Sequence, residues 1–492
     1  MWKKLSIGLF LLVAIAGIGY WSITNIKIEA ITLVSPDNSA IKEDIQLSLN
    51  KKAAISVEYW KTGTGEKYKT PLTGIEKDHV VHLMLLEPNT SYSYKVVING
   101  LIDINSKTFT FKTREPSPWM VHEWLKDKFP HDANALGDGL VMLCYRGFPG
   151  HISMVDGKGT IRWYWQDEEM GVRMATLTPR NTILALLAPA SKDEFHKKKK
   201  EKPIDLKSYY LRTGKIGFVG GTQIAEINLE GKVLWRVDID KQDIVFHHDL
   251  QMTKDHQIAS IYRDYKMYDL EGSGVKKDTL WGDGVMVMDT LGKVVKKWSA
   301  WDHWDLSKDN RLKEYAGDRF HFNSLTFDDN GDYILSTPIE NQVWKINAIT
   351  GKIEWKLGEN GDFKMNKDDL FYFQHDARID PKGNLMLFDN GDYSPNDTTK
   401  VNKRSRVLSF DLNTEEMTAD PKIKLVLPQK YYTSRMGGAA LLPNNNIMAT
   451  SSKTGGVLIT DSKGEVLWVL NTHFIPYRAE YVPSGFWQNY IQ

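Results

Sequence analysis

The sequence predicts an all-β protein in which a six-bladed β-propeller follows a small β-sandwich and an N-terminal membrane segment. Three observations predict this: an uncharged apolar run near the N-terminus, short alternating segments over residues 27–115, and a repeated pattern of strands from residue 120 to 470. Alternation of apolar and polar residues is typical of half-buried strands. Four-stranded repeats with a period of about 60 residues indicate propeller blades.

The composition is that of an ordinary globular protein. The chain has 492 residues, 41% of them hydrophobic and 25% charged, and 63 Lys and Arg balance 62 Asp and Glu to a net charge of +1. This near-zero charge argues against a general nucleic-acid binder, which needs a basic surface. The single cysteine, Cys144, excludes an internal disulfide, a multi-cysteine zinc site and two-thiol redox chemistry.

Residues 1–25 form the expected membrane segment. Lys3 and Lys4 precede an uncharged run over residues 5–23, which is long enough to cross a bilayer with the lysines on the cytoplasmic side. Small residues at 14–16 also fit a signal-peptidase site, so an uncleaved anchor and a removed signal peptide both stay open. Either one places the rest of the chain outside the cytoplasm, on the periplasmic or extracellular face.

Residues 27–115 are expected to form the β-sandwich. Segments 55–60 and 80–84 alternate apolar and polar residues, and turn residues separate them. The segment Leu86–Val96 resembles the corner and following strand of a fibronectin type III or immunoglobulin-like sandwich. A proline-containing linker over residues 115–119 follows.

Two independent patterns predict the six blades between residues 120 and 470. A Gly-x-x-x-Trp signature, once in a longer form, occurs five times, and its tryptophans are expected to pack the blades. An opening strand with a turn eight positions later occurs six times. In the clearest copy the four strands are expected over 321–328, 332–337, 342–347 and 352–357. Residues 471–492 are expected to form a tail that closes or covers the propeller.

The opening strands carry unusual side chains for a β-protein core. If these strands are innermost, their equivalent positions form a ring at one end of the central channel. Buried imidazoles and guanidiniums need a ligand or a dense hydrogen-bond network, and they suit a small oxyanion such as sulfate. A neutral imidazole is also a competent nucleophile. The ring positions are His131, Arg173, His248, Asn323, His375 and Gly437, with His321 and Arg435 two residues before two of them.

Seven short segments, in the same order along the chain, resemble the bacterial arylsulfate sulfotransferases. The resemblance implies a six-bladed propeller with a small N-terminal sandwich. It also implies ping-pong transfer of a sulfuryl group from a phenolic sulfate to a phenol through a sulfohistidine, without cofactor or metal. The segments are Phe246–Asp249, Asp318–Ser324, Trp355–Gly358, Phe373–Asp376, Leu387–Gly391, Ser405–Val407 and Tyr477–Ala479.

The resemblance also implies roles for particular residues. His375 would be the nucleophile. His321 and Asn323 would bind the sulfuryl oxygens or act as acid and base, and His248 would have a similar supporting role, with its neighbour His247 as the alternative.

One departure from the family pattern concerns the charge of the sulfate pocket. The family usually has an arginine in the strand after His-x-Asn, where this chain has Pro338. Arg435 is expected to supply the missing charge because it shares the inner-strand face with His321. Arg173 and, further from the axis, Arg406 are the alternatives.

Two other functions stay open. Three histidines on neighbouring strands could hold zinc or another transition metal in a metalloenzyme, although Asn323 and the arginines suit anions better. The chain could also be a non-catalytic, membrane-anchored propeller that binds or displays partners, because Pro338 removes a charge from the expected pocket. The expected partners are the phenolic sulfate, the phenol and the membrane, with no nucleic acid; a homodimer is left open.

Overall fold

A computed structural model describes residues 25–100, 103–117, 120, 125–130, 132–147, 149–189, 220–239, 244–272, 274, 277–392 and 403–492. The chain folds into two compact units, built almost entirely of β-strands. One unit holds the residues up to 120 together with 160–163 and 484–492. The other holds 121–159 and 164–483 and contains the propeller.

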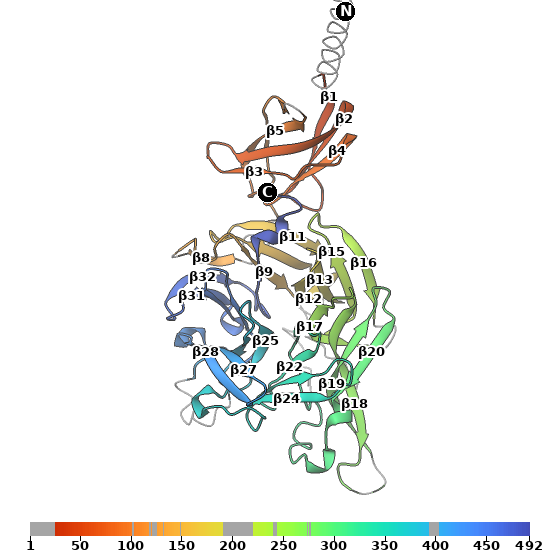
Figure 1. The fold of residues 1–492 in the computed structure, drawn as a ribbon, viewed down its shortest axis with the longest axis vertical. Helices are drawn as coiled ribbons and strands as arrows, with labels where there is room; N and C mark the ends of the chain where they lie inside the picture. The colour runs from red at the N-terminus through yellow and green to blue at the C-terminus, as the bar shows by residue number, and fades with distance from the viewer. Residues whose placement is uncertain are drawn as a thin grey trace, which may run out of the picture. The chain divides into compact units, whose positions relative to one another are not determined.

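The N-terminal unit is a set of strands organised around one long strand (Figure 1). Strand β2 (Glu43–Lys61) is 19 residues long, so its first part pairs with one set of neighbours and its second part with another. Alternate residues such as Ile45, Ile55 and Val57 are buried in a common core, as the alternating sequence predicts. The other strands are β1 (Ile28–Val34), β3 (Lys67–Lys69), β4 (Glu76–Leu83), β5 (Ser91–Asn99), β6 (Ile104–Asn105) and β7 (Phe109–Lys112).

The second unit is a six-bladed β-propeller, which confirms the all-β class and the predicted propeller. Each blade is an antiparallel sheet with four strands in its basic plan (Figure 1). Blade 1 consists of β9 (Leu140–Tyr145), β10 (Gly150–Val155), β11 (Ile161–Asp167) and β33 (Glu480–Val482). Blade 2 consists of β12 (Met170–Leu177), β13 (Ile183–Pro189), β15 (Gln223–Ile227) and β16 (Val233–Asp238). Blade 3 consists of β17 (Phe246–Met252), β18 (Ile258–Tyr268), β19 (Asp278–Met288) and β20 (Val294–Ser299), with β14 (Gly220–Gly221) beside β17.

The remaining blades follow the same plan, and their first strands lie innermost. Strand β12 contacts β17, β17 contacts β21, β21 contacts β25, and β25 contacts β29, as expected for strands around an axis. Blade 4 consists of β21 (Ser324–Phe327), β22 (Tyr333–Thr337), β23 (Gln342–Ile346) and β24 (Ile353–Gly358). Blade 5 consists of β25 (His375–Ile379), β26 (Leu385–Asp389), β27 (Arg406–Asn413) and β28 (Thr418–Val426). Blade 6 consists of β29 (Gly438–Leu441), β30 (Ile447–Ser451), β31 (Gly456–Thr460) and β32 (Val466–Thr472), with β8 (Leu125–Pro130) added beside β32.

The repeated tryptophans lie on the outermost of the four strands and link neighbouring blades. The indole N–H of Trp298 in β20 donates to the carbonyl of Gly351 in blade 4, at 2.9 Å. That of Trp468 in β32 donates to the carbonyl of Gly157 in blade 1, at 2.7 Å. The predicted packing role is therefore confirmed for these two positions. Strand β28 of blade 5 carries no tryptophan, in accord with its missing signature.

The closure of the ring differs from the sequence prediction. The repeat predicts that the inner strand of blade 1 begins at His131; this residue lies outside the described part of the chain, and residues 132–139 form turns. Strand β33 from the C-terminal segment takes the inner position beside β9, while the early strand β8 pairs with β32 of blade 6. Strands β8 and β33, at the two ends of the propeller segment, thus each cover a strand edge that would otherwise be unpaired.

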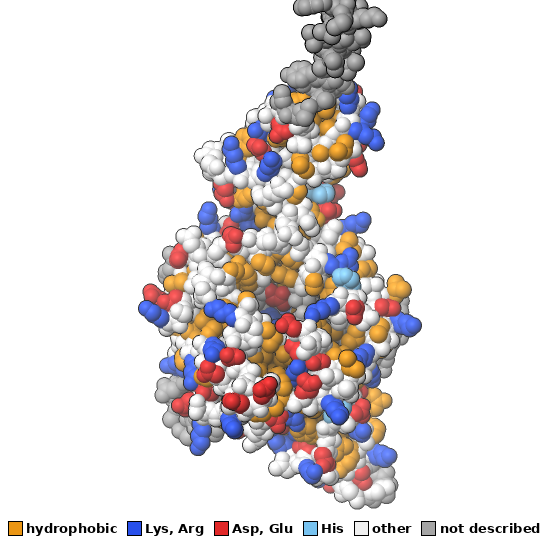
Figure 2. Space-filling model, viewed as in Figure 1, with side chains coloured by type: hydrophobic (Ala, Val, Ile, Leu, Met, Phe, Trp, Pro, Cys, Tyr) orange, Lys and Arg blue, Asp and Glu red, His pale blue; other side chains and the backbone are white. Residues whose placement is uncertain are grey.

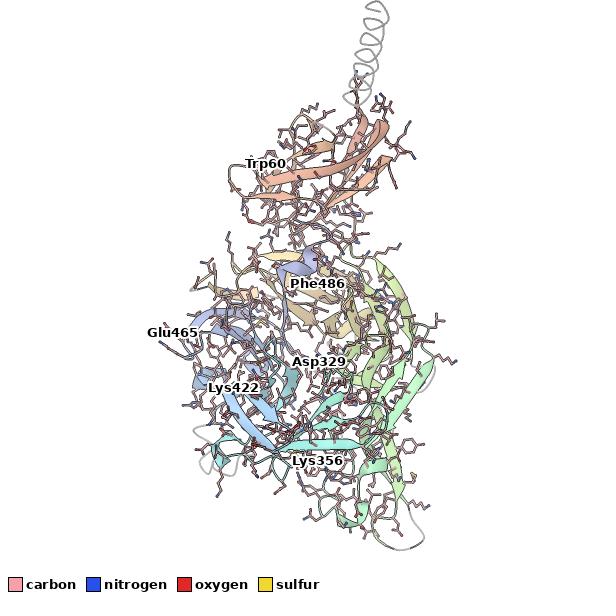
Figure 3. The ribbon with its side chains drawn as sticks, viewed as in Figure 1. Trp60, Asp329, Lys356, Lys422, Glu465 and Phe486 are labelled. Carbon is pink, nitrogen blue, oxygen red and sulfur yellow. The ribbon has the colours of Figure 1, made fainter. Side chains whose placement is uncertain are left out.

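The charged side chains at the surface are mixed in sign. Figure 2 shows Lys and Arg interspersed with Asp and Glu on the face in view, in keeping with the net charge of +1. Lys422 on β28 and Glu465 beside β32, labelled in Figure 3, are both exposed. Within the described residues no helix is long and apolar enough to cross a membrane. The predicted membrane segment falls almost wholly in residues 1–24, which lie outside them.

Candidate active site

Irregular backbone at the start of the inner strands brings the predicted residues to the site. In β17 the pairing register shifts between His247 and Leu250, and in β25 it shifts between His375 and Arg378. A β-bulge of this kind turns side chains away from the regular alternation. His248 in the first bulge has φ = 60°. A left-handed residue other than glycine costs on the order of 1–3 kcal/mol and is retained where the surrounding structure enforces it.

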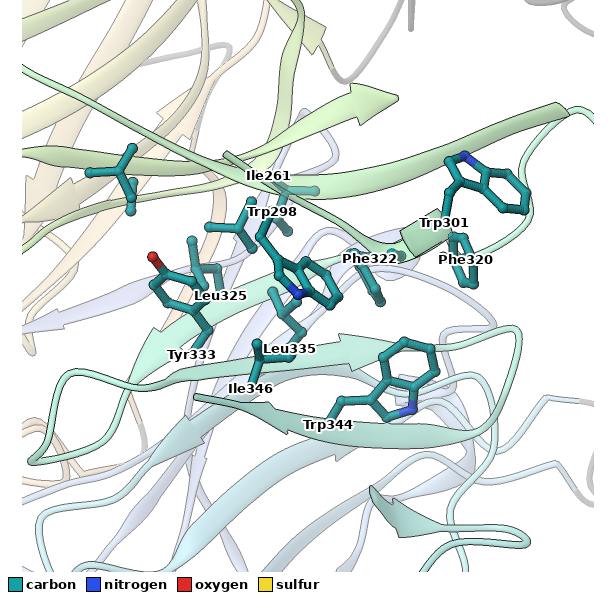
Figure 4. Close-up of a cluster of buried hydrophobic side chains, with 14 of the residues drawn as sticks. Ile261, Trp298, Trp301, Phe320, Phe322, Leu325, Tyr333, Leu335, Trp344 and Ile346 are labelled. Atoms are coloured by element: carbon teal, nitrogen blue, oxygen red, sulfur yellow. The ribbon is translucent and has the colours of Figure 1, made fainter. Parts of the chain in front are cut away.

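His321 lies in the loop before β21, between two anchored aromatic residues. It has φ = 53°, so the predicted opening strand begins at Ser324 instead of residue 321. Phe320 and Phe322 on either side are fully buried in the cluster between blades 3 and 4 (Figure 4). Trp344 packs edge-on against both phenylalanine rings, at 6.0 and 5.6 Å. This packing of Phe320 and Phe322 fixes the position of the His321 backbone between them.

The structure brings the three predicted histidines together. The ring centroids of His248 and His321 are 4.9 Å apart in an edge-to-face arrangement. His375 lies within electrostatic range of both, because each of these imidazoles influences the pKa of another. Residues from blade 3, the loop before blade 4, and blade 5 therefore share one site, although 127 positions separate the first from the last.

His248 and His375 are neutral imidazoles at neutral pH. Burial is the largest cause and lowers the pKa of His248 well below 6.5; His247, His321, His375 and Arg146 lower it further. Burial also lowers the pKa of His375 to about 4, although its bond to Asn390 opposes this. Each ring therefore keeps an unshared electron pair on one nitrogen.

The hydrogen bonds of Asn390 determine which nitrogen of His375 carries its proton. The side-chain NH₂ of Asn390 donates to the carbonyls of Thr433 and Met436, both at 2.8 Å, so its Oδ1 is the acceptor. His375 Nδ1–H donates to this oxygen at 2.8 Å. The electron pair is therefore on Nε2, which accepts a long hydrogen bond from the Met436 N–H at 3.2 Å.

The pKa of His321 shifts in the opposite direction. Burial alone would lower its pKa, but the charge of the Asp318 carboxylate and the bond between His321 Nδ1 and Asp318 Oδ2, at 2.5 Å, raise it above 6.5. Asp283 adds to this effect. Three histidines within one site therefore provide two neutral rings and one ring that retains its proton more readily.

Four charged residues, three of them buried and Arg378 partly buried, join the strands of these histidines. Arg478 pairs with Asp376, which follows His375, and with Asp249, which follows His248, the latter at 3.2 Å. Arg378 pairs with the same two carboxylates at 2.9 and 2.6 Å. The two positive and two negative charges balance. Arg478 Nη2 also donates to the His248 carbonyl at 2.8 Å, so this group holds the backbone of the site.

Two predicted polar residues serve mainly to hold other residues. Asn323 is fully buried, and its NH₂ donates to the carbonyl of Gln374 at 2.8 Å, which ties the His321 loop to the strand of His375. His247 is buried beside His248, with their Nδ1 atoms 2.6 Å apart. His247 thus contacts a site histidine directly, whereas Asn323 contacts the residue before His375.

The three predicted arginines have different positions. Arg406 in β27 donates to Asp389 Oδ2 at 2.7 Å and to two backbone carbonyls, so it is held away from the histidines. Arg435 is exposed, and within the described residues its guanidinium makes no ion pair. Arg173 in β12 is 8% exposed and lies close enough to Arg146 to lower its pKa.

Arg146 is a cation at the site that the sequence analysis did not single out. It follows β9, and its guanidinium lies over the ring of Tyr477, 5.2 Å from the centroid; Tyr477 in turn contacts His248. Burial, followed by repulsion from Arg173, lowers the pKa of Arg146 to about 10. Its Nε is buried without a hydrogen-bond partner, and no described carboxylate forms an ion pair with it. Such a cation favours a bound oxyanion.

Several residues that hold or surround the site histidines lie within the family-like motifs, although the sequence predicted no role for them. Asp249, Asp376, Tyr477 and Arg478 follow or accompany the predicted residues. An acidic residue directly after a histidine on a predicted inner strand could have indicated a buried ion pair, because buried charges require partners. Arg146 had no such signal, since nothing in the local sequence places it near the axis.

A comparison with known families identifies the family of the propeller. The family model described as Arylsulfotransferase (ASST) matches residues 126–457, which span most of the propeller. The chain belongs to the arylsulfotransferase family. The search of curated proteins finds no match. Among the described residues of this arylsulfotransferase-family protein, no three His, Cys, Asp or Glu side chains are arranged to hold a metal ion.

Solved structures with a similar fold are distant from this arylsulfotransferase-family chain. A protein of unknown function from Bacteroides caccae is 11% identical, with a TM-score of 0.39, over 70% of this chain and 99% of its own. An inactive variant of virginiamycin B lyase from Staphylococcus aureus, solved with quinupristin, is also 11% identical, with a TM-score of 0.31, over 61% of this chain and 69% of its own. At these values they carry no functional argument.

Proposed function

We propose that the protein is an arylsulfate sulfotransferase that moves a sulfuryl group from a phenolic sulfate to a phenol by a ping-pong mechanism. The observation that carries the proposal is the meeting of His248, His321 and His375 in a propeller of this family. A neutral imidazole with a fixed Nδ1–H, as in His375, has the nucleophilic nitrogen that such a mechanism requires.

The first half-reaction forms a sulfohistidine. His375 Nε2 leaves its long bond to the Met436 N–H and attacks sulfur, so that an N–S bond forms while the S–O bond to the donor phenol breaks. The departing phenol oxygen takes a proton from an adjacent histidine, His248 or His321. The Asn390 oxygen remains bonded to Nδ1–H and stabilises the positive charge that develops on the ring.

The second half-reaction returns His375 to its starting state. The acceptor phenol attacks sulfur, the N–S bond breaks, and the phenol proton passes to a neighbouring histidine. The sulfuryl oxygens keep negative charge throughout, and Arg146 with Arg173 provides the positive charge that Pro338 does not. Arg435, which is exposed, is a weaker candidate than the sequence analysis gave it.

The direct test is to mix the purified protein with 4-nitrophenyl sulfate and phenol. We expect equal amounts of 4-nitrophenol and phenyl sulfate, and parallel lines in double-reciprocal plots when both substrates are varied. His375→Ala should abolish transfer, whereas His473→Gln, at an exposed position, should leave it unchanged. Folded protein that produces no phenyl sulfate would remove the proposal.

The same proposal covers the remaining expectations for the whole chain. The N-terminal unit is a fibronectin type III or immunoglobulin-like module, and residues 5–23 anchor or direct the protein to the membrane so that the propeller acts outside the cytoplasm. Recovery in the membrane fraction, with release by detergent but not by salt, tests the anchor. A homodimer is tested by the mass of the detergent-free propeller in solution.

A further inference from the structure

A buried chain of contacts leads from His248 through His247 to Asp283. His248 Nδ1 lies 2.6 Å from His247 Nδ1, and His247 Nε2 lies 3.1 Å from Asp283 Oδ1. The second contact has the distance of a hydrogen bond but not its angle. His247 and Asp283 are at most 1% exposed, so water does not compete with these contacts.

This chain determines the tautomer of His248. A carboxylate oxygen 3.1 Å away attracts an N–H and repels an unshared electron pair, which favours the proton of His247 on Nε2, the nitrogen that faces Asp283. When His247 is neutral, its Nδ1 then has the electron pair and accepts from His248 Nδ1–H. The electron pair of His248 is consequently on Nε2, the nitrogen that is not engaged in this chain. An unshared pair on that atom is what a general base requires.

The chain continues from Asp283 to His321. Arg263 stands directly opposite Asp283 across strands β18 and β19, and its Nη1 lies 3.3 Å from Asp283 Oδ1. The same nitrogen donates to Asp318 Oδ1 at 2.5 Å, and Asp318 Oδ2 accepts from His321 Nδ1 at 2.5 Å. The contacts therefore form a loop, because the rings of His321 and His248 face each other at 4.9 Å.

The charges of this loop balance with one protonated histidine. Asp283 and Asp318 contribute two negative charges and Arg263 one positive charge. A single imidazolium makes the loop neutral, whereas a second would leave an uncompensated buried charge. The imidazolium belongs at His321, since this ring contacts a carboxylate at Nδ1, while His248 contacts another imidazole.

We propose that this loop gives the two facing histidines separate duties: His321 is the acid that protonates the departing phenol, and His248 is the base that takes the proton of the acceptor phenol. His247, Asp283, Arg263 and Asp318 are positioning residues. The inference rests on the proposed sulfuryl transfer. After one cycle the proton has moved from His321 to His248, and its return between the facing rings restores the starting state.

The groups around both rings favour this division. The side chains around His248 include no carboxylate: they are His247 on the same strand, His321, His375, Arg146 and Tyr477. Arg478 contacts the backbone carbonyl of His248. Around His321 stand Asp318 and Asp283, with Arg263 as the opposing cation. The pKa of His248 accordingly falls and that of His321 rises.

Nitrogen NMR of the full chain with ¹⁵N-labelled histidine reads these states without any turnover. At pH 7 we expect His248 as the Nδ1–H tautomer with a bare Nε2, and His321 protonated on both nitrogens. Signals are assigned through His248→Gln and His321→Gln variants. A His248 ring with its proton on Nε2, or a neutral His321, would overturn the inference even if the protein transfers sulfuryl groups. If the spectrum is as expected but the protein transfers no sulfuryl group, the protonation states assigned to the loop hold and the proposed function is rejected.

Two amide substitutions separate the acid from the base by kinetics. Asp318→Asn should slow transfer from phenyl sulfate about 10²-fold or more but affect 4-nitrophenyl sulfate much less, because a good leaving group needs little protonation. Asp283→Asn lets His247 change tautomer, so it should lower kcat about 10²–10⁴-fold with both donors while KM changes little. It should also move the proton of His248 to Nε2 in the spectrum.

The control is Asp329→Asn, an exposed carboxyl labelled in Figure 3, which should change neither rate nor spectrum. If Asp318→Asn slows both donors equally, or if Asp283→Asn leaves the His248 tautomer unchanged, the assigned duties are wrong. If either variant fails to fold, the spectrum of the unmodified protein still decides the question.

Discussion

At the scale of single residues, three histidines acquire different chemistry from their neighbours. His248 and His375 are buried against neutral or cationic groups, and the pKa of each falls. The His321 side chain is 34% exposed, and the Asp318 carboxylate raises its pKa. Burial penalises the charged form, and a close opposite charge repays that penalty. Residue type therefore identified the candidates, whereas the partners decided their protonation.

The first prediction at this scale concerns Arg146. Arg146→Met removes a partly buried cation near His248 but preserves much of its contact with Tyr477. Loss of a charge-assisted contact to the sulfuryl group, worth about 1.5–3 kcal/mol, should lower kcat/KM for aryl sulfates about 10- to 150-fold. Arg180→Met, at a half-exposed guanidinium of blade 2, is the matched control. Equal activity in the two variants would exclude Arg146 from sulfate binding.

A second prediction follows from the pKa directions of the His321–Asp318 pair. The raised pKa of His321 adds stability that is complete below pH 6.5 and is lost as pH rises through the folded-state value. The lowered pKa of Asp318 adds stability above pH 3.8 that is lost at lower pH.

His321→Gln should therefore reduce the free energy of unfolding most between about pH 4 and 6.5, and less at pH 9. Urea denaturation at pH 5.5 and pH 9 measures the difference, with His473→Gln as the exposed control. A loss that is larger at pH 9 than at pH 5.5 would contradict the sign of the shift.

The sequence could supply the site histidines but not the groups that tune them. Their equivalent positions in the repeats sufficed to bring His248 and His375 to one end of the axis. Asn390, Asp283 and Arg478 could not be assigned in this way, because their roles depend on contacts between strands that lie far apart in sequence. The exposure of Arg435 could not be read from the sequence for the same reason, because its position on a strand face gave no information on solvent access.

At the scale of elements, loops and bulges position the chemistry, and regular strands support them. The predicted strand from residue 321 begins at Ser324 because His321 adopts a left-handed conformation, which a β-strand does not accommodate. The four predicted strands of blade 4 otherwise correspond closely to β21–β24. Alternation and turn residues predicted these strands well; the bulges have no comparable sequence signal.

Phe322 provides the test of this support. Phe322→Ala would leave a cavity beside Phe320 and Trp344 in the cluster of Figure 4 and should cost about 3–5 kcal/mol of unfolding free energy. Phe322→Leu should cost less because it fills more of the space, and Leu291→Ala, at an exposed site, should change stability by about 0.5 kcal/mol or less. Chemical denaturation measures all three. A loss for Phe322→Ala no larger than that for Leu291→Ala would show that the loop has other anchors.

At the scale of the whole molecule, six blades close into a ring through β8, which precedes them in the chain, and β33, which follows them. The number of blades was predictable because two sequence patterns repeat at the same period. The origin of the inner strand of blade 1 was not, because the three residues of β33 repeat neither pattern. Closure also brings Arg478, just before β33, to the carboxylates of blades 3 and 5.

Val482 tests this closure. It is fully buried in β33 opposite Leu140, so Val482→Asp places a carboxyl group in an apolar contact and should destabilise the propeller by more than about 3 kcal/mol. Val426→Asp, half-exposed on β28, should have an effect of about 0.5 kcal/mol or less. Thermal unfolding compares the two. Equal melting temperatures would show that β33 is dispensable for the ring.

The account rests on His375 as the residue that carries the sulfuryl group between donor and acceptor. The most direct measurement is mass spectrometry of the protein after brief exposure to 4-nitrophenyl sulfate without acceptor, followed by rapid quenching at alkaline pH. We predict a gain of one SO₃ group on the peptide that contains His375, which disappears when phenol is added before the quench. A sulfuryl group on another residue, or none while transfer proceeds, would contradict the account.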